Sequence, residues 1–376
     1  MTLLSSLLAQ TGFSDADILA LLRLEDETDI AQLRQAAFEV ATREVGNSVY
    51  CRGLVEISNL CVRDCLYCGI RKSNHAISRY SLDAQTVIEA ATWAARTGYG
   101  SCVLQAGERQ DAAFVRFIED CVREIKQRTI SETLPQGLGI TLSLGEQSLE
   151  TYRRWFNAGA HRYLLRIETS SPALFARIHP REQSIKSRLQ ALADLASVGF
   201  QVGTGVMIGL PEQTLEDLAA DIRFFADRDI DMIGMGPYIT ATGGAMTDES
   251  MMPSHDLLQL SLKMIAVTRL VLRDVNIAAT TALQTLAADG RERGIAFGAN
   301  VVMPNMTPVE ARANYQLYDG KVCLNESREE CSGCLARRIL SVGRHVGHNA
   351  WGDSKHYGRR NDARDTPKNS LQSRQR

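Results

Sequence analysis

The chain has 376 residues, of which 44% are hydrophobic and 23% charged, and its formal net charge is −2. This length and composition are typical of a water-soluble globular protein built around one large α/β domain. The balanced charge produces no overall field toward nucleic acid or a lipid surface, so neither is an expected partner.

The N-terminus carries no targeting signal that the residues reveal. The first basic residue is Arg23, and the preceding segment has the pattern of a capped helix. The longest stretch without charge covers residues 195–211 and contains four glycines, which makes it too short and too broken to cross a bilayer. We therefore expect a cytoplasmic protein without a membrane anchor.

Residues 1–48 predict an N-terminal helical segment, because their apolar residues recur at helical spacing. From residue 49 onward, short apolar runs alternate with amphipathic stretches. The runs predict eight strands, at 53–60, 101–105, 139–144, 162–168, 201–208, 232–239, 277–282 and 300–303. The stretches predict helices at 84–97, 112–125, 147–157, 185–197, 215–225 and 257–272, with only a short helix before the last strand.

This alternation predicts right-handed βαβ units and a parallel sheet. Eight such units predict an α/β fold of the (β/α)8 TIM type over residues 49–312. Residues 313–354 would form a C-terminal extension. Residues 355–376 carry seven Lys or Arg and two Asp, which predicts a disordered basic tail.

Polar residues follow several of the expected strands. Glu108 follows the second strand, Ser143 lies near the end of the third, and Glu168 ends the fourth. Thr280 and Thr281 fall in the seventh. Because the carboxyl ends of barrel strands carry the chemistry in this fold, we expect these side chains around one site.

Three of the nine cysteines follow the first expected strand, as Cys61, Cys65 and Cys68 in a C-x3-C-x2-C pattern. Three thiolates on one short loop can hold three corners of a [4Fe–4S] cube and leave the fourth iron open for catalysis. The alternative is a zinc site completed by His75.

The cysteine spacing resembles that of the radical S-adenosylmethionine (SAM) superfamily. Two further segments agree: residues 106–108 resemble a turn that binds the methionyl amine, and residues 205–212 resemble a strand that supports adenine, with Met207 where Ile is usual. The resemblance implies a [4Fe–4S] cluster that cleaves SAM to a 5′-deoxyadenosyl radical under anaerobic conditions.

Within that superfamily, residues 50–352 resemble the HydE family of [FeFe]-hydrogenase maturases, on segments 53–59, 141–146, 163–169, 277–282, 298–305 and 315–318. The resemblance implies SAM contacts from Tyr67, Glu108, Ser143, Glu168, Arg188 and Met207. It also implies a substrate pocket inside the barrel, formed by Thr141, Arg166, Thr280, Thr281, Met303 and Tyr315.

The implied substrate is an organometallic small molecule, an iron carbonyl/cyanide synthon that carries cysteine, on the way to the diiron site of the hydrogenase. We expect Arg166 to bind its carboxylate, because the neighbouring strands offer this guanidinium no obvious acidic partner. The implied protein partners are the maturases HydG and HydF and a reductant such as ferredoxin or flavodoxin.

Three further cysteines, Cys323, Cys331 and Cys334, form a second group in the extension. The resemblance implies an accessory [2Fe–2S] or [4Fe–4S] cluster there, and structural zinc completed by His345 or His348 is the alternative. The isolated Cys51, Cys102 and Cys121 are expected to be small core residues.

Two other functions stay open at this point. One is another enzyme of the biotin synthase-like group, such as the methylornithine synthase PylB, which is not expected to carry the second cysteine triad. The other is a non-enzymatic iron–sulfur or zinc scaffold, against which the polar lining of the expected barrel argues.

Overall fold

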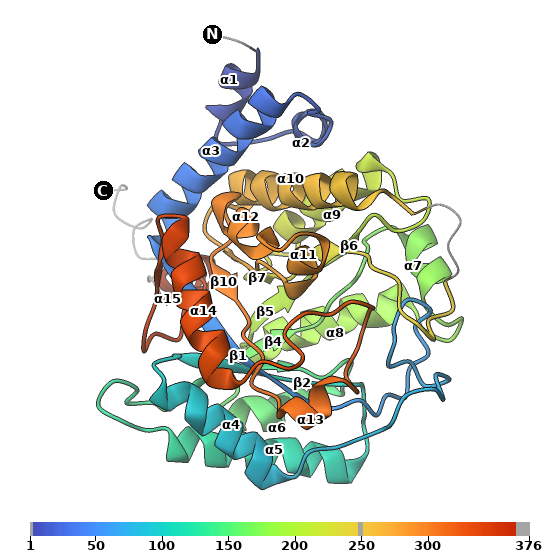
Figure 1. The fold of residues 1–376 in the computed structure, drawn as a ribbon, viewed down its shortest axis with the longest axis vertical. Helices are drawn as coiled ribbons and strands as arrows, with labels where there is room; N and C mark the ends of the chain where they lie inside the picture. The colour runs from blue at the N-terminus through green and yellow to red at the C-terminus, as the bar shows by residue number, and fades with distance from the viewer. Residues whose placement is uncertain (1–2, 247–250, 366–376) are drawn as a thin grey trace, which may run out of the picture.

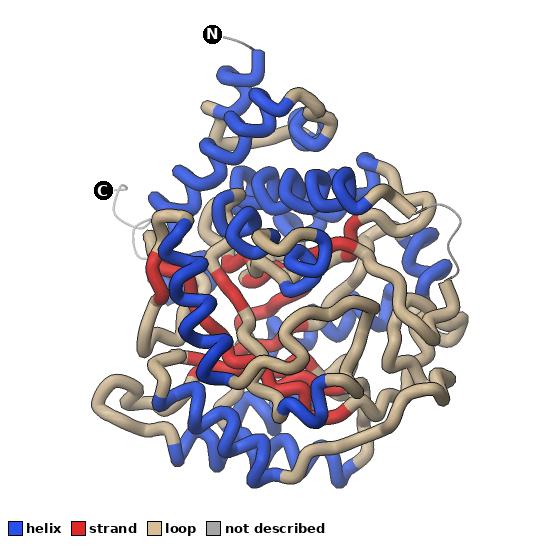
Figure 2. The backbone as a smooth tube through the Cα atoms, in the orientation of Figure 1, coloured by secondary structure: helices blue, strands red, loops and turns tan. Residues whose placement is uncertain are grey.

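The computed structural model describes residues 3–246 and 251–365. Strands occupy the centre and helices surround them (Figures 1 and 2). The main sheet is parallel and follows the path β10-β1-β2-β3-β4-β5-β7-β9. These strands are β1 (Ser48–Ser58), β2 (Ser101–Ala106), β3 (Gly139–Ser143), β4 (Arg162–Leu164), β5 (Gln201–Thr204), β7 (Met232–Ile233), β9 (Asn276–Ile277) and β10 (Val301–Val302).

Backbone hydrogen bonds bring the two ends of this path together. The amide of Asn300 donates to the carbonyl of Ile277 at 2.9 Å, and the amide of Ala279 donates to that of Val301 at 2.9 Å. Ala278 and Val301 also form a parallel bridge. The predicted α/β barrel of eight parallel strands is thereby confirmed.

The fifth and sixth expected strands are each broken in two. Beyond β5 and β7 the chain continues as β6 (Met207–Ile208) and β8 (Gly236–Pro237), which form a separate two-stranded sheet. The break falls where the two backbones meet closely, since a Cβ on Gly205 would lie 2.0 Å from the carbonyl oxygen of Gly234. β6 and β8 can therefore diverge from the barrel wall that β5 and β7 help to form.

The helices cover the outside of the barrel, and side-chain caps start most of them, for example at Asp83, Asp111, Ser148 and Thr214. The N-terminal helices pack on this layer, with α3 along α10. In chain order the helices are α1 (Leu3–Leu8), α2 (Asp15–Leu22), α3 (Glu27–Val45), α4 (Ala84–Arg96), α5 (Ala112–Arg128), α6 (Leu149–Ala158), α7 (Pro172–Ile178), α8 (Ile185–Val198), α9 (Leu215–Asp227), α10 (Ser254–Leu272), α11 (Thr281–Leu286) and α12 (Gly290–Ala296). No helix in the described ranges is long and apolar enough to span a membrane.

The seventh expected strand is shorter than predicted. Thr280 and Thr281 lie outside β9, because Thr280 is the N-cap of α11 and Thr281 is its first helical residue. The chain leaves the sheet after Ala279, whose amide makes the last bond to the neighbouring strand. The two threonines therefore lie on the turn above the barrel wall.

The C-terminal extension joins the barrel. After α13 (Val309–Arg312) and α14 (Arg328–Ser341), β11 (His345–Val346) pairs with the start of β1. Residues 351–354 then run under the strands, where the carbonyl of Gly352 accepts hydrogen bonds from Arg52 and Asn276. This segment covers the end of the barrel opposite the cysteine loop.

The prediction of a disordered tail is wrong for residues 355–365, which form helix α15 (Lys355–Asp365). Its basic residues meet carboxylates on the barrel: Arg360 pairs with Asp229 and Asp231, and Arg359 pairs with Asp274. These long-range ion pairs order a segment whose composition by itself predicts no folded structure. The rest of the predicted tail, residues 366–376, lies outside the described residues.

Candidate active site

The first cysteine loop lies at the carboxyl end of β1 and is fixed to β2. The amide of Val62 donates to the carbonyl of Glu108 at 2.9 Å. A Cβ on Gly107 would lie 2.4 Å from the carbonyl oxygen of Leu60 and 2.8 Å from Cys61 Cβ, so only glycine allows this approach. The position therefore matches the one expected for the catalytic loop.

The chemistry of the three thiols fits an iron–sulfur cluster. Cys61, Cys65 and Cys68 are all partly buried. Burial raises the pKa of each thiol, that of Cys65 to about 12, so the thiolates need cationic iron to form. Nothing in the described part of the chain groups three His, Cys, Asp or Glu side chains as a single metal ion would need, and the zinc alternative's His75 is exposed.

Charged residues form a network beside this loop. Arg63 Nε lies 2.6 Å from Glu108 Oε1, and the amide of Glu146 donates to Glu108 Oε2 at 3.0 Å. Arg188 Nε lies 2.7 Å from Glu146 Oε1, with both side chains buried. Burial raises the pKa of Glu108 despite Arg63. Burial disfavours the charged form of Arg188, but the attraction of the Glu146 carboxylate is stronger and raises the pKa of the guanidinium.

A cavity of about 210 Å³ lies beside the cysteine loop inside the barrel mouth. It brings together nine of the residues that the sequence predicted. They are Tyr67, Cys68, Ser143, Glu168 and Met207, assigned to the cluster or SAM, and Arg166, Thr280, Thr281 and Met303, assigned to the substrate. One cavity thus joins the two halves of the predicted site.

Arg166 differs from the expectation, because it has an acidic partner. Its Nε and Nη2 lie 3.1 and 2.8 Å from Glu168 Oε2, and Nη2 also donates to the carbonyl of Val206. The fourth expected strand is shorter than predicted, since β4 ends at Leu164, and the two side chains meet on the segment that follows it. Glu168 has a positive φ of 66°, and its backbone is held by bonds to Gly205 and Met207.

Two predicted substrate residues lie apart from this cavity lining. Thr141 lines a smaller cavity of about 30 Å³ deeper in the barrel, where its hydroxyl accepts a hydrogen bond from Arg162. Tyr315 is buried, and its hydroxyl accepts a hydrogen bond from Gln105, which does line the larger cavity.

Sequence reasoning missed a buried ion pair in the same cavity, between Glu56 and Lys321. Glu56 lies on β1 and also accepts a hydrogen bond from Asn305 at 3.1 Å. The presence of a carboxylate within an otherwise apolar strand could have indicated a functional or paired position at Glu56. Lys321 offered none, because it lies in a loop of the extension, 265 residues away from its partner.

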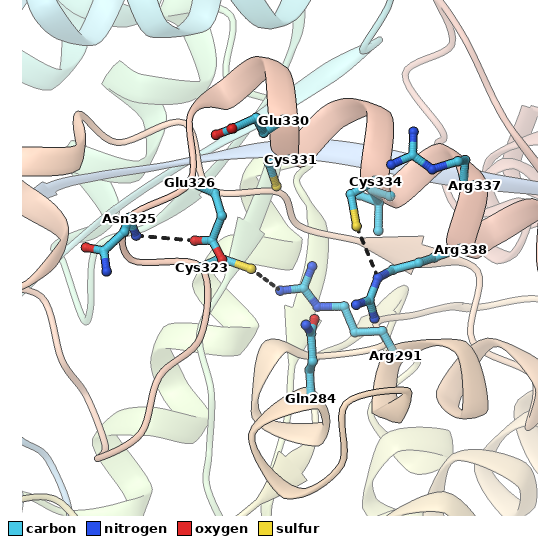
Figure 3. A pocket seen from close by; sticks show the side chains of 11 residues that line it. Gln284, Arg291, Cys323, Asn325, Glu326, Glu330, Cys331, Cys334, Arg337 and Arg338 are labelled. Atoms are coloured by element: carbon cyan, nitrogen blue, oxygen red, sulfur yellow. Dashed lines mark hydrogen bonds between the residues drawn. The ribbon is translucent and has the colours of Figure 1, made fainter.

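The second cysteine triad lines a separate pocket of about 580 Å³ (Figure 3). Arg291 lies 3.9 Å from Cys323 Sγ, and Arg338 lies 3.3 Å from Cys334 Sγ. A hydrogen bond from Cys331 lowers the pKa of Cys323 to about 6, and the same contact raises that of Cys331. Two of the three sulfurs, those of Cys323 and Cys334, therefore face a guanidinium, a donor that can stabilise a thiolate ligand.

The histidines of the zinc alternative lie elsewhere. His345 Nε2 is 3.0 Å from the hydroxyl of Ser48, and His348 lies against Gly98. Neither lines the triad's pocket. The isolated Cys51, Cys102 and Cys121 are buried, as predicted.

Residues 55–225 match the Radical SAM superfamily, which agrees with the barrel and with the cysteine loop at its mouth. The chain is therefore a radical SAM enzyme, a class that uses a [4Fe–4S] cluster and SAM. It is 40% identical to the [FeFe] hydrogenase maturase subunit HydE of Thermotoga maritima, over 89% of this chain and 92% of that protein. The chain belongs to the HydE family.

More distant relatives share the fold. A 3-methylornithine synthase of Methanosarcina acetivorans is 26% identical over 80% of this chain and 83% of its own. The crystal structure of methylornithine synthase (PylB) has a TM-score of 0.75 at 23% identity and covers 93% of this chain and 98% of its own. That of HydG, a maturase of the [FeFe]-hydrogenase, has a TM-score of 0.72 at 18% identity and covers 91% and 74%.

Proposed function

We propose that this protein is a maturase of [FeFe]-hydrogenase that processes a cysteine-bound iron carbonyl/cyanide synthon during assembly of the diiron site. The observation that carries the proposal is the joint lining of one cavity by Cys68, Glu168 and Arg166, in a chain of the HydE family. We further propose that it acts in the cytoplasm with HydG, HydF and a reductant such as ferredoxin or flavodoxin.

In this proposal Cys61, Cys65 and Cys68 hold the cluster, and cluster and SAM together supply a 5′-deoxyadenosyl radical. Glu168 accepts hydrogen bonds from the amine or ribose of SAM through its carboxylate. Glu108, Glu146 and Arg188 form the charged wall beside the loop and orient the methionyl end.

The substrate would occupy the cavity on the side of Thr280, Thr281 and Met303. The hydroxyl of Thr280 is buried without a hydrogen-bond partner among the described residues, so it is ready to donate to a bound anion. The apolar wall of Leu54, Leu164 and Met303 excludes water from the reacting carbon.

We also propose an accessory cluster at Cys323, Cys331 and Cys334. The support is the shared pocket and the two arginines that face its sulfurs. Arginine donors near thiolate ligands stabilise a cluster's negative charge.

The test uses anaerobically reconstituted protein. With SAM and dithionite it should release 5′-deoxyadenosine, and together with HydG, HydF and apo-hydrogenase it should restore hydrogen evolution that is absent without it. Cleavage of SAM without any support of maturation would contradict the maturase assignment. Production of 3-methylornithine would instead assign the methylornithine synthase activity.

A further inference from the structure

The accessory triad and the reaction cavity share no lining residue, but one short segment of the extension connects them. Residues 315–321, which form a cover segment, end two positions before Cys323. Leu317, Tyr318 and Lys321 of this segment line the reaction cavity. The segment contains no helix or strand, so contacts with its surroundings must hold it in place.

Contacts on the cavity side tie the cover segment to the first cysteine loop. The amide of Gly69, the residue after the last cysteine of that loop, donates to the carbonyl of Leu317 at 3.0 Å. A Cβ on Gly69 would lie 2.2 Å from the carbonyl oxygen of Gln316, so the two backbones are in close contact. Lys321 pairs with Glu56 inside the cavity. The cover segment therefore packs directly on the loop that would hold the catalytic cluster.

At its outer edge the cover segment is held through one residue, Asp319. Its amide donates to the carbonyl of Thr240 at 2.8 Å. Its carboxylate accepts from the amide of Thr242 at 2.8 and 2.9 Å and from the hydroxyl of Thr242 at 2.9 Å. These hydrogen bonds are exposed to solvent, and a segment held by few such bonds opens more easily than the core.

The other end of the cover segment leads into the triad. Cys323 has a positive φ of 62°, which a non-glycine residue keeps only where its surroundings fix it. Arg312 Nη1 fixes the backbone by donating to the carbonyl of Cys323 at 3.1 Å. Cys331 and Cys334 lie on α14. A metal centre bound by all three thiolates would therefore fix the Cys323 side chain too and fasten this end of the segment to α14.

A buried arginine forms a second connection between the two sites. Arg291 is 4% exposed, and its Nη2 lies 3.9 Å from Cys323 Sγ (Figure 3) and 3.2 Å from Thr281 Oγ1. An anionic metal centre on the triad would give this buried guanidinium a counter-charge and hold it in place. Thr281 lines the reaction cavity. Because its hydroxyl accepts from Arg291, its hydrogen remains available to a ligand in the cavity.

From these two connections we infer that the accessory triad is a regulatory metal site, whose metal holds the cover segment closed over the reaction cavity. The inference rests on the proposed function, in which the triad binds a cluster. The loaded site slows the entry and release of ligands, and the empty site lets the cover segment open. Thermodynamic linkage makes the effect mutual, so a change that opens the cover segment weakens the hold of the triad on its metal.

The first test is hydrogen–deuterium exchange, followed by mass spectrometry, on the reconstituted holoprotein and on the triple Ala variant of the triad, both with the first cluster in place. The amides of Gly69 and Thr242 bond to the cover segment and lie far from the triad in the sequence. Both should exchange at least about fivefold faster in the variant. The amide of Gly139, bonded to Gly100 in the barrel, should not change. Cys121→Ala, at a buried cysteine outside the triad, should behave as the wild type.

The second test opens the cover segment and leaves the three thiols in place. Asp319→Ala removes the carboxylate that Thr242 binds, and it should speed the loss of accessory iron to a chelator at least about fivefold. The accessory iron is followed by the electron paramagnetic resonance signal that the triple Ala variant lacks. Asp256→Ala, which removes an exposed carboxylate beside His255, is the matched control. Circular dichroism checks that both variants are folded.

Equal exchange of the Gly69 and Thr242 amides with the triad loaded and removed would overturn the inference. Unchanged loss of accessory iron in Asp319→Ala would overturn it as well. Iron analysis separates this outcome from a failure of the proposed function. A wild type that binds iron only at the first cluster loses both the accessory cluster and the inference. A wild type loaded at both sites, with exchange that does not depend on the triad, loses the inference alone.

Discussion

Arg63 and Glu108 tie the cysteine loop to the end of β2, with Nε and Oε1 2.6 Å apart. The other carboxylate oxygen of Glu108 accepts from the amide of Glu146, whose side chain holds Arg188. The loop that would carry the cluster and the residues that would face SAM are thus one connected unit.

This connection predicts that Glu108→Gln weakens SAM binding about tenfold. The glutamine amide keeps the shape of the carboxylate but loses its negative charge. That charge pairs with Arg63 and would bind the methionyl amine of SAM. Equilibrium binding of SAM to the reconstituted protein measures it. Glu216→Gln, in the exposed pair with Arg23, is the matched control and should leave the affinity unchanged. An unaltered affinity in Glu108→Gln would remove this residue from the site.

Replacement of Cys61, Cys65 or Cys68 by Ala is expected to abolish SAM cleavage, since each thiolate holds one corner of the cluster. The measurement is 5′-deoxyadenosine formed after dithionite reduction under anaerobic conditions. Cys51→Ala, at a buried core position, should keep the activity. Full cleavage by any one of the three loop variants would refute the cluster assignment.

The accessory triad is expected to be dispensable for radical formation. Cys323, Cys331 and Cys334 line a pocket that shares no residue with the reaction cavity. A triple Ala variant should lose roughly one cluster's worth of iron and sulfide and still cleave SAM. Iron analysis and the 5′-deoxyadenosine assay on the same preparation check both parts, and loss of cleavage in a folded variant would count against the separation.

Arg166→Lys is expected to leave SAM cleavage without substrate largely intact while hydrogenase maturation falls at least about tenfold. Lysine keeps the positive charge but lacks the planar fork that can hold a carboxylate in a fixed orientation. A defined in vitro maturation assay reports the effect. Wild-type maturation by this variant would make Arg166 a structural partner of Glu168 and nothing more.

His356 is expected to make the stability of the C-terminal helix depend on pH. Its ring lies 3.2 Å from Asp274 and 2.5 Å from Asp229, and the hydrogen bond with Asp274, against the effect of burial, raises its pKa to about 9. This pKa is higher than the pKa of about 6.5 that histidine has in the unfolded chain. The stabilisation is therefore complete below about pH 6.5 and disappears as the pH rises through 9.

His356→Gln should therefore lower the free energy of unfolding by about 1–2 kcal/mol at pH 6, a range that allows for the partial exposure of the ring. At pH 9.5 the variant and the wild type should differ by less than about 0.5 kcal/mol. Anaerobic urea denaturation at the two pH values measures this, with His255→Gln in an exposed pair as the control. An equal loss at both pH values would show that the protonated ring contributes nothing.

Local features of the chain were enough to predict much of the fold and part of the site. The alternation of apolar runs and amphipathic stretches predicted the barrel because each pattern depends only on residues a few positions apart. The spacing of Cys61, Cys65 and Cys68 predicted the cluster loop for the same reason. Arg166 and Glu168 were expected on one strand face; their side chains do meet, but on the segment beyond β4, where the strand period does not apply.

Other features depend on which distant segments meet when the barrel closes. Glu56 pairs with Lys321, α15 is ordered by Asp229, Asp231 and Asp274, and Thr141 lies deeper than the cavity at the mouth. The spacing of residues along the chain does not reveal such partners. An ion pair between distant residues becomes favourable only where the fold brings the two charges together and removes water from them. The chemistry could therefore be predicted from short motifs, whereas the pairing of Glu56 with Lys321 and the order of residues 355–365 depended on tertiary contacts.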